Sequence, residues 1–174
     1  MNIKSQFEVS ANVGLYELPL ETKYNDWKWP FSPGFPTSTE LYQNRFLIDK
    51  GKNLVVDMGL FQVLALMIGS STASFSYCGV GSGTSTPIAG QTTLDTEIGR
   101  NPILFKSRTG LTAYFDTTFG ENDKNGTWNE TALFNSSSGG DMLCRRKFPT
   151  TFTKNTSKAA VVSWTITISA VADA

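Results

Sequence analysis

The side chains best suited to acid–base chemistry are two pairs of carboxylates. Asp95 and Glu97 are two residues apart, so they share one face if a strand continues through them, and Asp116 with Glu130 is a second conceivable pair. Two neighbouring carboxylates can act as acid and base in glycoside cleavage. Close like charges are also common on solvated strands, and the sequence alone brings no nucleophile next to a base. We therefore predict no catalytic residue.

The stretch 77–97, around which the chain is organised, is rich in glycine. Gly79, Gly81 and Gly83 occupy every second position, and Gly83 is followed by Thr84. A phosphate-binding loop of the Walker type requires Lys and then Ser or Thr after its last glycine. A dinucleotide fingerprint requires a third glycine at a fixed offset that opens a helix. Both are missing, so we predict that these glycines let the backbone bend or come close to another segment.

A third candidate is a loop that resembles part of a calcium-binding loop. Glu121, Asp123 and Asn125 alternate, and Gly126 occupies the sixth place. An EF-hand also requires a bidentate Glu at the twelfth place, which is Ala132 here, and helices on both sides. The Asn-Gly pair is a strong turn signal. We predict a hairpin loop without a metal.

Composition points away from enzymes. The 174 residues contain no histidine, which removes the commonest general base and a frequent metal ligand. We expect a protein without enzymatic activity, cofactor or metal.

Charge gives no indication of a nucleic-acid or membrane partner. Fifteen basic and fifteen acidic residues cancel, and charged residues make up 17% of the chain. A neutral chain has no overall field that would attract nucleic acid or anionic lipid. The dense basic cluster of Arg145, Arg146 and Lys147 indicates either solvated strand residues or partners of acidic residues on a neighbour.

Cysteine content and the N-terminal sequence bear on the compartment. Cys78 and Cys144 are the two cysteines, which could pair on neighbouring strands but are expected to be buried free thiols. The start M-N-I-K-S-Q-F-E lacks the features of a signal peptide. The longest apolar stretch, 54–68, contains Asp57 and Gln62 and is too short to span a bilayer. We expect the product to stay where it is made.

Residues 1–48 are predicted to form an extended arm. Their apolar residues follow no sustained period, and Pro30, Pro33 and Pro36 recur at the three-residue period of polyproline II. The arm could lie over its own domain or, as we favour, over another subunit; an SH3 ligand and a sugar-stacking platform are alternatives. Five aromatic side chains are expected to be the contact residues of this arm: Trp27, Trp29, Phe31, Phe35 and Tyr42.

Residues 49–174 are predicted to form the folded domain, with one helix near its start. Asn53 or Asp57 can serve as the N-cap, and Gly69 suits the left-handed position after the last turn. The helix is apolar nearly all round, interrupted late by Gln62. Such a helix is expected to be buried against a sheet and under a loop or a neighbour.

The rest of the chain shows the two-residue period of strands. Val162, Trp164, Ile166 and Ile168 alternate with polar residues in the last segment, and Pro149 indicates a break or an edge. We predict a mainly β fold, an antiparallel β-sandwich or jelly-roll-like domain with one buried helix and an extended N-terminal arm. The predicted strands are 45–52, 74–79, 100–106, 111–119, 128–135, 142–148 and 158–169.

Several stretches together resemble the small virion structural proteins of tailed bacteriophages. The stretches are N-L-V-V-D-M-G-L, G-V-G-S-G-T-S-T-P-I-A-G-Q-T-T-L-D-T-E-I, T-W-N-E-T-A-L-F-N-S-S-S-G-G-D-M-L-C-R-R and V-V-S-W-T-I-T-I. In that family a helix precedes a G-x-G-T-x-x-P-x-x-G-x-T-x-L turn, and an E-x-x-L-F-N…G-G-x-M-L-x-R strand pair follows. The resemblance covers about residues 53–168, none of the predicted arm, and brings no catalytic residue.

The resemblance implies a non-enzymatic virion protein that assembles in the cytoplasm of a bacterial host. The first hypothesis is a trimeric capsid decoration or cement protein that stabilises the head by binding neighbouring major capsid proteins, with the arm exchanged between subunits. The alternative is a component of the tail, neck, baseplate or fibre attachment. A glycan- or receptor-binding module is a further alternative of another class. No cofactor, nucleic acid or membrane partner is expected.

Overall fold

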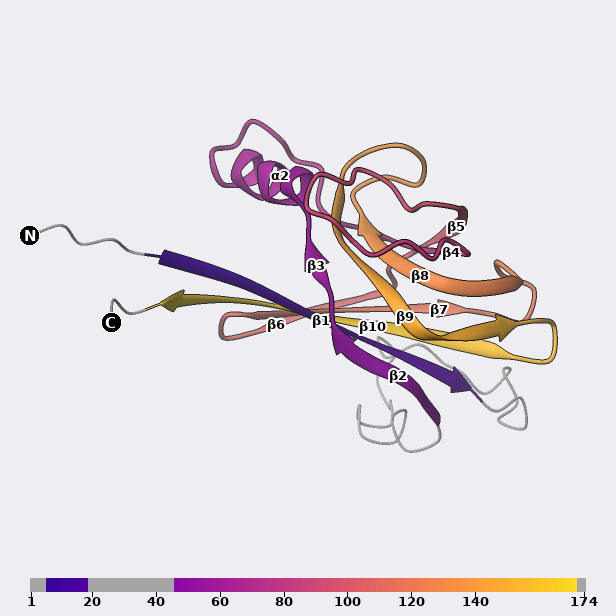
Figure 1. Ribbon diagram of the computed structural model, residues 1–174. Helices are drawn as coiled ribbons and strands as arrows, with labels where there is room; N and C mark the ends of the chain where they lie inside the picture. Colours follow the sequence, from indigo (N-terminus) through magenta and orange to yellow (C-terminus); the bar gives the residue numbers. More distant parts are fainter. Residues whose placement is uncertain (1–5, 19–45, 172–174) are drawn as a thin grey trace, which may run out of the picture.

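The computed structural model describes residues 6–18 and 46–171. These residues form two five-stranded antiparallel sheets that pack together as a sandwich-like domain (Figure 1). The predicted mainly β, antiparallel sandwich is therefore confirmed. Within the described residues, no helix is both long and apolar enough to span a membrane.

The first sheet contains both ends of the described chain. Its strands lie in the order β2 (Phe46–Lys52), β1 (Gln6–Leu18), β10 (Ala159–Val171), β7 (Thr112–Phe119) and β6 (Phe105–Thr109). The two long strands β1 and β10 pair along their whole length, from Gln6 with Val171 to Leu18 with Ala159. As predicted, Val162, Trp164 and Ile166 of β10 point into the core, whereas Ile168 is exposed.

The prediction that residues 1–48 form an arm is wrong for Gln6–Leu18, because this segment is an internal strand of the first sheet. Ala11, Val13 and Leu15 are buried in the core at alternate positions. The period of two was present in the sequence, but Asn12 and Gly14 weaken its β-propensity. The boundary at residue 48 is also wrong, because Phe46–Lys52 is one continuous strand.

The second sheet carries the central stretch of the sequence. Its strands lie in the order β3 (Leu54–Val55), β9 (Met142–Lys154), β8 (Gly126–Phe134), β4 (Tyr77–Gly81) and β5 (Glu97–Pro102). The strand predicted at 100–106 is in fact two strands, since β5 belongs to this sheet and β6 to the other. Ile103 and Leu104 form the crossing, where their N–H groups donate to Ser76 and Asp116 of the two sheets.

Strand β9 continues past Pro149, where the sequence indicated a break or an edge. Lys147 pairs with Glu130 and Phe152 pairs with Trp128, so four residues of β9 face the single residue Asn129. Such a bulge tolerates proline because the ladder hydrogen bonds are already interrupted there.

The cysteines lie in one row across the second sheet. Cys78 pairs with Leu133, and Leu133 pairs with Cys144. The two cysteines are therefore two strands apart, about 9–10 Å, which is too far for a disulfide. Both are buried free thiols, as expected.

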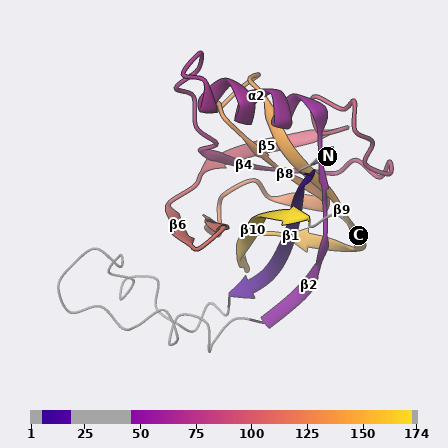
Figure 2. The ribbon, with the colours of Figure 1, turned by 90° about the vertical axis from the view of Figure 1, so that its left-hand side faces the viewer.

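Helix α2 (Asp57–Met67) lies outside the second sheet, on the side away from the first (Figure 2). Gly59 touches β9 so closely that a Cβ there would lie 2.4 Å from the Leu143 carbonyl oxygen. The predicted N-cap is wrong, because Val56 occupies that position without a side-chain hydrogen bond. Gly69 adopts a φ of 72°, as expected for a helix end.

The prediction of one buried helix is wrong as well. Of its residues only Gly59 and Gln62 are buried. Five large apolar side chains on the outer side are exposed: Leu60 (38%), Phe61 (63%), Leu64 (55%), Met67 (76%) and Ile68 (79%). They recur at positions i, i+1, i+4, i+7 and i+8, which form one stripe of a helix. We call these five residues the α2 face.

Candidate functional site

The aromatic contact residues predicted from the sequence lie outside the described residues. They are Trp27, Trp29, Phe31, Phe35 and Tyr42. Their contact with a subunit or a capsid stays a prediction.

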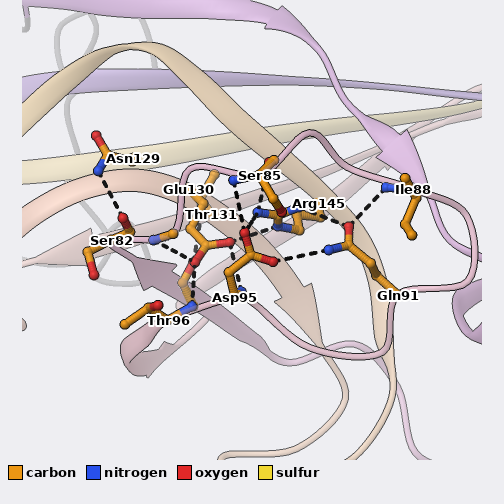
Figure 3. Close-up of polar contacts among 12 residues, drawn as sticks. Ser82, Ser85, Ile88, Gln91, Asp95, Thr96, Asn129, Glu130, Thr131 and Arg145 are labelled. Atoms are coloured by element: carbon orange, nitrogen blue, oxygen red, sulfur yellow. Dashed lines mark hydrogen bonds and ion pairs between the residues drawn. The ribbon is translucent and has the colours of Figure 1, made fainter.

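The carboxylates considered for acid–base chemistry have other partners in the structure than in the sequence analysis. Asp95 and Glu130 bind the same arginine, Arg145, at 2.9 Å and 2.7 Å (Figure 3). Glu97 instead forms a bidentate pair with Arg100, with both N–O distances 2.9 Å. Neither of the two conceivable pairs therefore shares a partner, and Asp95 is joined with Glu130 instead. Sequence proximity did not reveal the pair because Asp95 precedes β5 and Glu130 lies in β8.

The Glu130 carboxylate is completely buried and accepts four hydrogen bonds. Its Oε1 accepts from the backbone N–H groups of Gly83 at 3.0 Å and Thr96 at 2.9 Å. Its Oε2 accepts from the N–H of Asp95 at 3.1 Å and from Nε of Arg145 at 2.7 Å. A carboxylate offers about four acceptor sites, so all of them are used. No lone pair is left to take a proton from a substrate.

Arg145 completes the cluster from β9. Besides Nε to Glu130, its terminal nitrogens donate to Gln91 Oε1 at 2.9 Å, to Asp95 Oδ2 at 2.9 Å and to the Ser85 carbonyl oxygen at 3.2 Å. The guanidinium is fully buried. One cation thus connects the sheet to three points of the loop between β4 and β5 (Figure 3).

The glycines of the central stretch make room for this carboxylate. A Cβ on Gly81 would lie 2.6 Å from Oε1 of Glu130 and 2.6 Å from the carbonyl oxygen of Thr96. A Cβ on Gly83 would lie 2.3 Å from the same Oε1 and 2.3 Å from Cβ of Asp95. The prediction of a close approach is confirmed. The approaching group is the protein's own carboxylate, which occupies the backbone N–H groups that a phosphate would need.

Asp95 is held in its ionised form. Hydrogen bonding by Ser85 and the positive charge of Arg145 lower its pKa below the usual range, against the opposing effect of partial burial. A general acid requires the opposite shift. The cluster of Asp95, Glu130, Arg145, Ser85 and Gln91, here called the Glu130 cluster, is thus suited to fixing the loop and not to proton transfer.

The Cys78 thiol is unreactive for a similar reason. Burial raises its pKa to about 11, although hydrogen bonds from Thr131 and Trp164 oppose the shift. Trp164 Nε1 donates to the sulfur at 3.4 Å. A nucleophilic cysteine must be a thiolate in a partly exposed, electropositive setting. Cys78 is a core residue.

A lysine fills the loop that resembled a calcium site. Lys154 Nζ donates to the carbonyl oxygens of Gly120 at 2.6 Å and Glu121 at 3.2 Å, and to Asn125 Oδ1 at 2.9 Å. Asp123 accepts instead from the Gly120 N–H at 2.9 Å. The ammonium group therefore occupies three of the oxygens that a bound cation would use. Among the described residues, no group of three or more Cys, Asp or Glu side chains could hold a metal.

The basic cluster is split between the two faces of β9. Arg146 pairs with Asp49 of β2 and donates to the Lys52 carbonyl oxygen at 2.6 Å, so it connects the two sheets. Arg145 belongs to the Glu130 cluster, and Lys147 is exposed. Both arginines pair with acidic residues, which belong to the same chain. Because successive side chains of a strand point to opposite faces, a strand through these residues already implies that Arg145 and Arg146 face opposite sides.

The α2 face is the functional candidate that the sequence reasoning missed. Exposed contiguous apolar patches of more than a few hundred Å² are uncommon on monomers and mark interaction sites. The i, i+4, i+8 spacing of Leu60, Leu64 and Ile68 was the available signal. Because apolar residues also occur on the other sides of the helix, the sequence favours a buried helix and not an exposed stripe.

Comparisons of this chain with protein-family models, with curated proteins and with solved structures find no match.

Proposed function

We propose that this chain is a non-enzymatic structural subunit of a tailed-bacteriophage virion, and more specifically a capsid decoration or cement protein that binds neighbouring major capsid proteins. The observation that carries the proposal is the α2 face, a stripe of five neighbouring apolar side chains that are exposed among the described residues. A surface of this kind is used for contact with another protein.

The polar clusters of the domain support a role without chemistry. Glu130 has no acceptor site left, Cys78 is a buried thiol, and Lys154 fills the loop that could have held a cation. The Glu130 carboxylate, the Cys78 thiol and the loop oxygens thus each have partners within the chain.

The virion assignment rests on the sequence resemblance, and the structure gives its motifs a physical meaning. The motif residues Gly81, Gly83, Glu130 and Arg145 form the Glu130 cluster with its glycine neighbours. These residues specify a way of pinning a loop to a sheet. Their spacing therefore supports an architecture shared with the proteins that the chain resembles. Experiment must decide between a position on the head and one on the tail.

Quantitative mass spectrometry of purified particles, combined with imaging of the particle, tests the proposal. A decoration protein is expected in hundreds of copies on the head. Tens of copies or fewer, located on the tail or neck, would favour the tail alternative over the capsid one. Absence from particles would contradict a virion role altogether.

The contribution of the aromatic segment requires substitutions, because deleting residues 1–40 would remove β1. We expect the double substitution Trp27→Ser, Trp29→Ser to reduce occupancy on capsids while the domain stays folded. Unchanged occupancy would show that these side chains are not contact residues.

A further inference from the structure

We propose that the α2 face packs against the α2 face of a second copy of this chain about a two-fold axis. The inference goes beyond the proposed function, because it assigns the α2 face to contact between copies of the chain and leaves contact with the capsid proteins to other surfaces. It predicts a pairwise contact, in contrast to the trimer implied by the resemblance.

The first argument is the shape of the surface. Gly59 and Gln62 face inward, where Gln62 Nε2 donates to Ser71 Oγ at 2.8 Å and to the Ala73 carbonyl oxygen at 2.6 Å. The helix is thereby fixed to its own domain by its polar side chain. Its large apolar side chains project outward, and packed helices lie about 8–10 Å apart. Ala65, one turn from both Phe61 and Ile68, leaves room for a close approach.

The second argument is the absence of charge. Residues 58–94 contain no Lys, Arg, Asp or Glu, so nothing on the α2 face would repel an identical face. The whole chain has a formal net charge of +0, which also removes long-range repulsion between copies. A helix that lies on a lipid surface typically carries Lys and Arg beside its apolar stripe. Asp57 is the single charged residue of α2, which favours a protein over a membrane.

The third argument is area. The exposed surface of the five side chains is on the order of 600 Å² on each copy, or about 1,200 Å² for the pair, which is the lower limit of specific interfaces. In a two-fold arrangement each residue meets its symmetry partner or a neighbour of it, so one stripe is enough to build the whole contact. Leu64, at the middle of the stripe, would lie nearest the axis.

Sedimentation equilibrium of the full chain tests the contact. The wild type is expected to have twice the mass of the 19.0 kDa chain. Leu64→Glu would bury two like charges at the axis and is expected to weaken association about 30-fold or more. Leu111→Glu is the matched control, because Leu111 is 69% exposed in the turn between β6 and β7. Should Leu64→Glu fail to fold by circular dichroism, Phe61→Ser takes its place.

Cross-linking then locates the contact. Cys78 and Cys144 are both 0% exposed, so a thiol introduced by Leu64→Cys is the accessible one among the described residues. A short bis-maleimide is expected to give covalent dimers with Leu64→Cys and monomers with Leu111→Cys. The inference is overturned by a wild type that stays monomeric up to about 100 µM, by a trimeric mass, or by a dimer that Leu64→Glu leaves intact.

These results are independent of the particle experiment. A dimer through α2 in a protein that is absent from virions would refute only the virion role. A virion protein that is monomeric in solution would refute only the α2 contact.

Discussion

The loop between β4 and β5 and helix α2 lie on either side of β4 in the chain, yet their exposed surfaces differ in kind. The loop is held by the Glu130 cluster, where a buried carboxylate and a buried guanidinium bind six loop groups. The helix is held by Gln62, by backbone hydrogen bonds of Val56 and Asp57 and by apolar contacts, and it turns its larger apolar side chains outward. The polar groups of the loop thus find partners within the chain, whereas no described residue covers the outer side of the helix.

The largest expected effect comes from breaking the loop's carboxylate. All four partners of Glu130 are N–H donors, so in Glu130→Gln the new amide NH₂ must face two donors in either orientation. The substitution also removes the buried negative charge of Glu130 that pairs with Arg145. We expect a loss of about 3–5 kcal/mol in the free energy of unfolding, measured by urea denaturation.

The matched control is Glu97→Gln. Glu97 also pairs with an arginine, but its side chain is 29% exposed. We expect a loss of less than about 1 kcal/mol. Equal losses for the two variants would mean that the Glu130 cluster does not stabilise the loop as described.

A smaller effect is expected from closing the space that the glycines leave. The Cβ in Gly83→Ala would lie 2.3 Å from Oε1 of Glu130, so the carboxylate or the loop must move. Overpacking of this kind costs about 1–3 kcal/mol. Gly90→Ala in the same loop meets nothing within 4 Å and should be nearly neutral. If both variants unfold at the same urea concentration, the close approach is not tight.

Within the helix, the polar residue should matter more to the fold than the apolar one. Gln62→Ala removes both hydrogen bonds of a buried amide and leaves the Ala73 carbonyl without this donor, at a cost of about 1–3 kcal/mol. Leu64→Ala removes a side chain that is 55% exposed, so its effect in dilute, monomeric protein should stay within about 0.5 kcal/mol. A larger loss of stability for Leu64→Ala than for Gln62→Ala would mean that Leu64 is buried in the core, which would contradict an exposed α2 face.

The sandwich could be predicted from the sequence because its strands alternate. Strands β7 and β10 were predicted nearly residue by residue, since Trp164 and Ile166 alternate with threonines. Strand β1 was missed although Val9, Ala11, Val13 and Leu15 alternate in the same way, because Asn12 and Gly14 lower its β-propensity. Whether the chain changes sheets at Ile103 depends on tertiary hydrogen bonds that no local pattern records.

Of the Glu130 cluster, the sequence predicted only the glycines, where the backbone leaves room for another group. Three alternating glycines indicated that something comes close, but the group that does so is 47 residues from Gly83 in the sequence. Its identity depends on the register between β4 and β8, where Gly81 pairs with Glu130. For α2, hydrophobicity alone does not distinguish a side chain covered by its own domain from one that awaits a partner.

The smallest expected effect concerns the charge of Asp95 in the Glu130 cluster. The folded pKa of Asp95 lies below its ordinary value, chiefly through Ser85 and with Arg145 contributing. A lowered carboxyl pKa adds stability above the unfolded pKa, and this stability is lost as the pH falls through the folded pKa. Asp95 is 26% exposed, so solvent screening limits its contribution to less than about 1 kcal/mol. Asp95→Asn should therefore be slightly less stable at pH 7 and lose less stability than the wild type on acidification. Ser85→Ala should reproduce part of that change, and urea titrations with an unaltered acid slope in both variants would show that the Asp95 charge is not coupled to the loop.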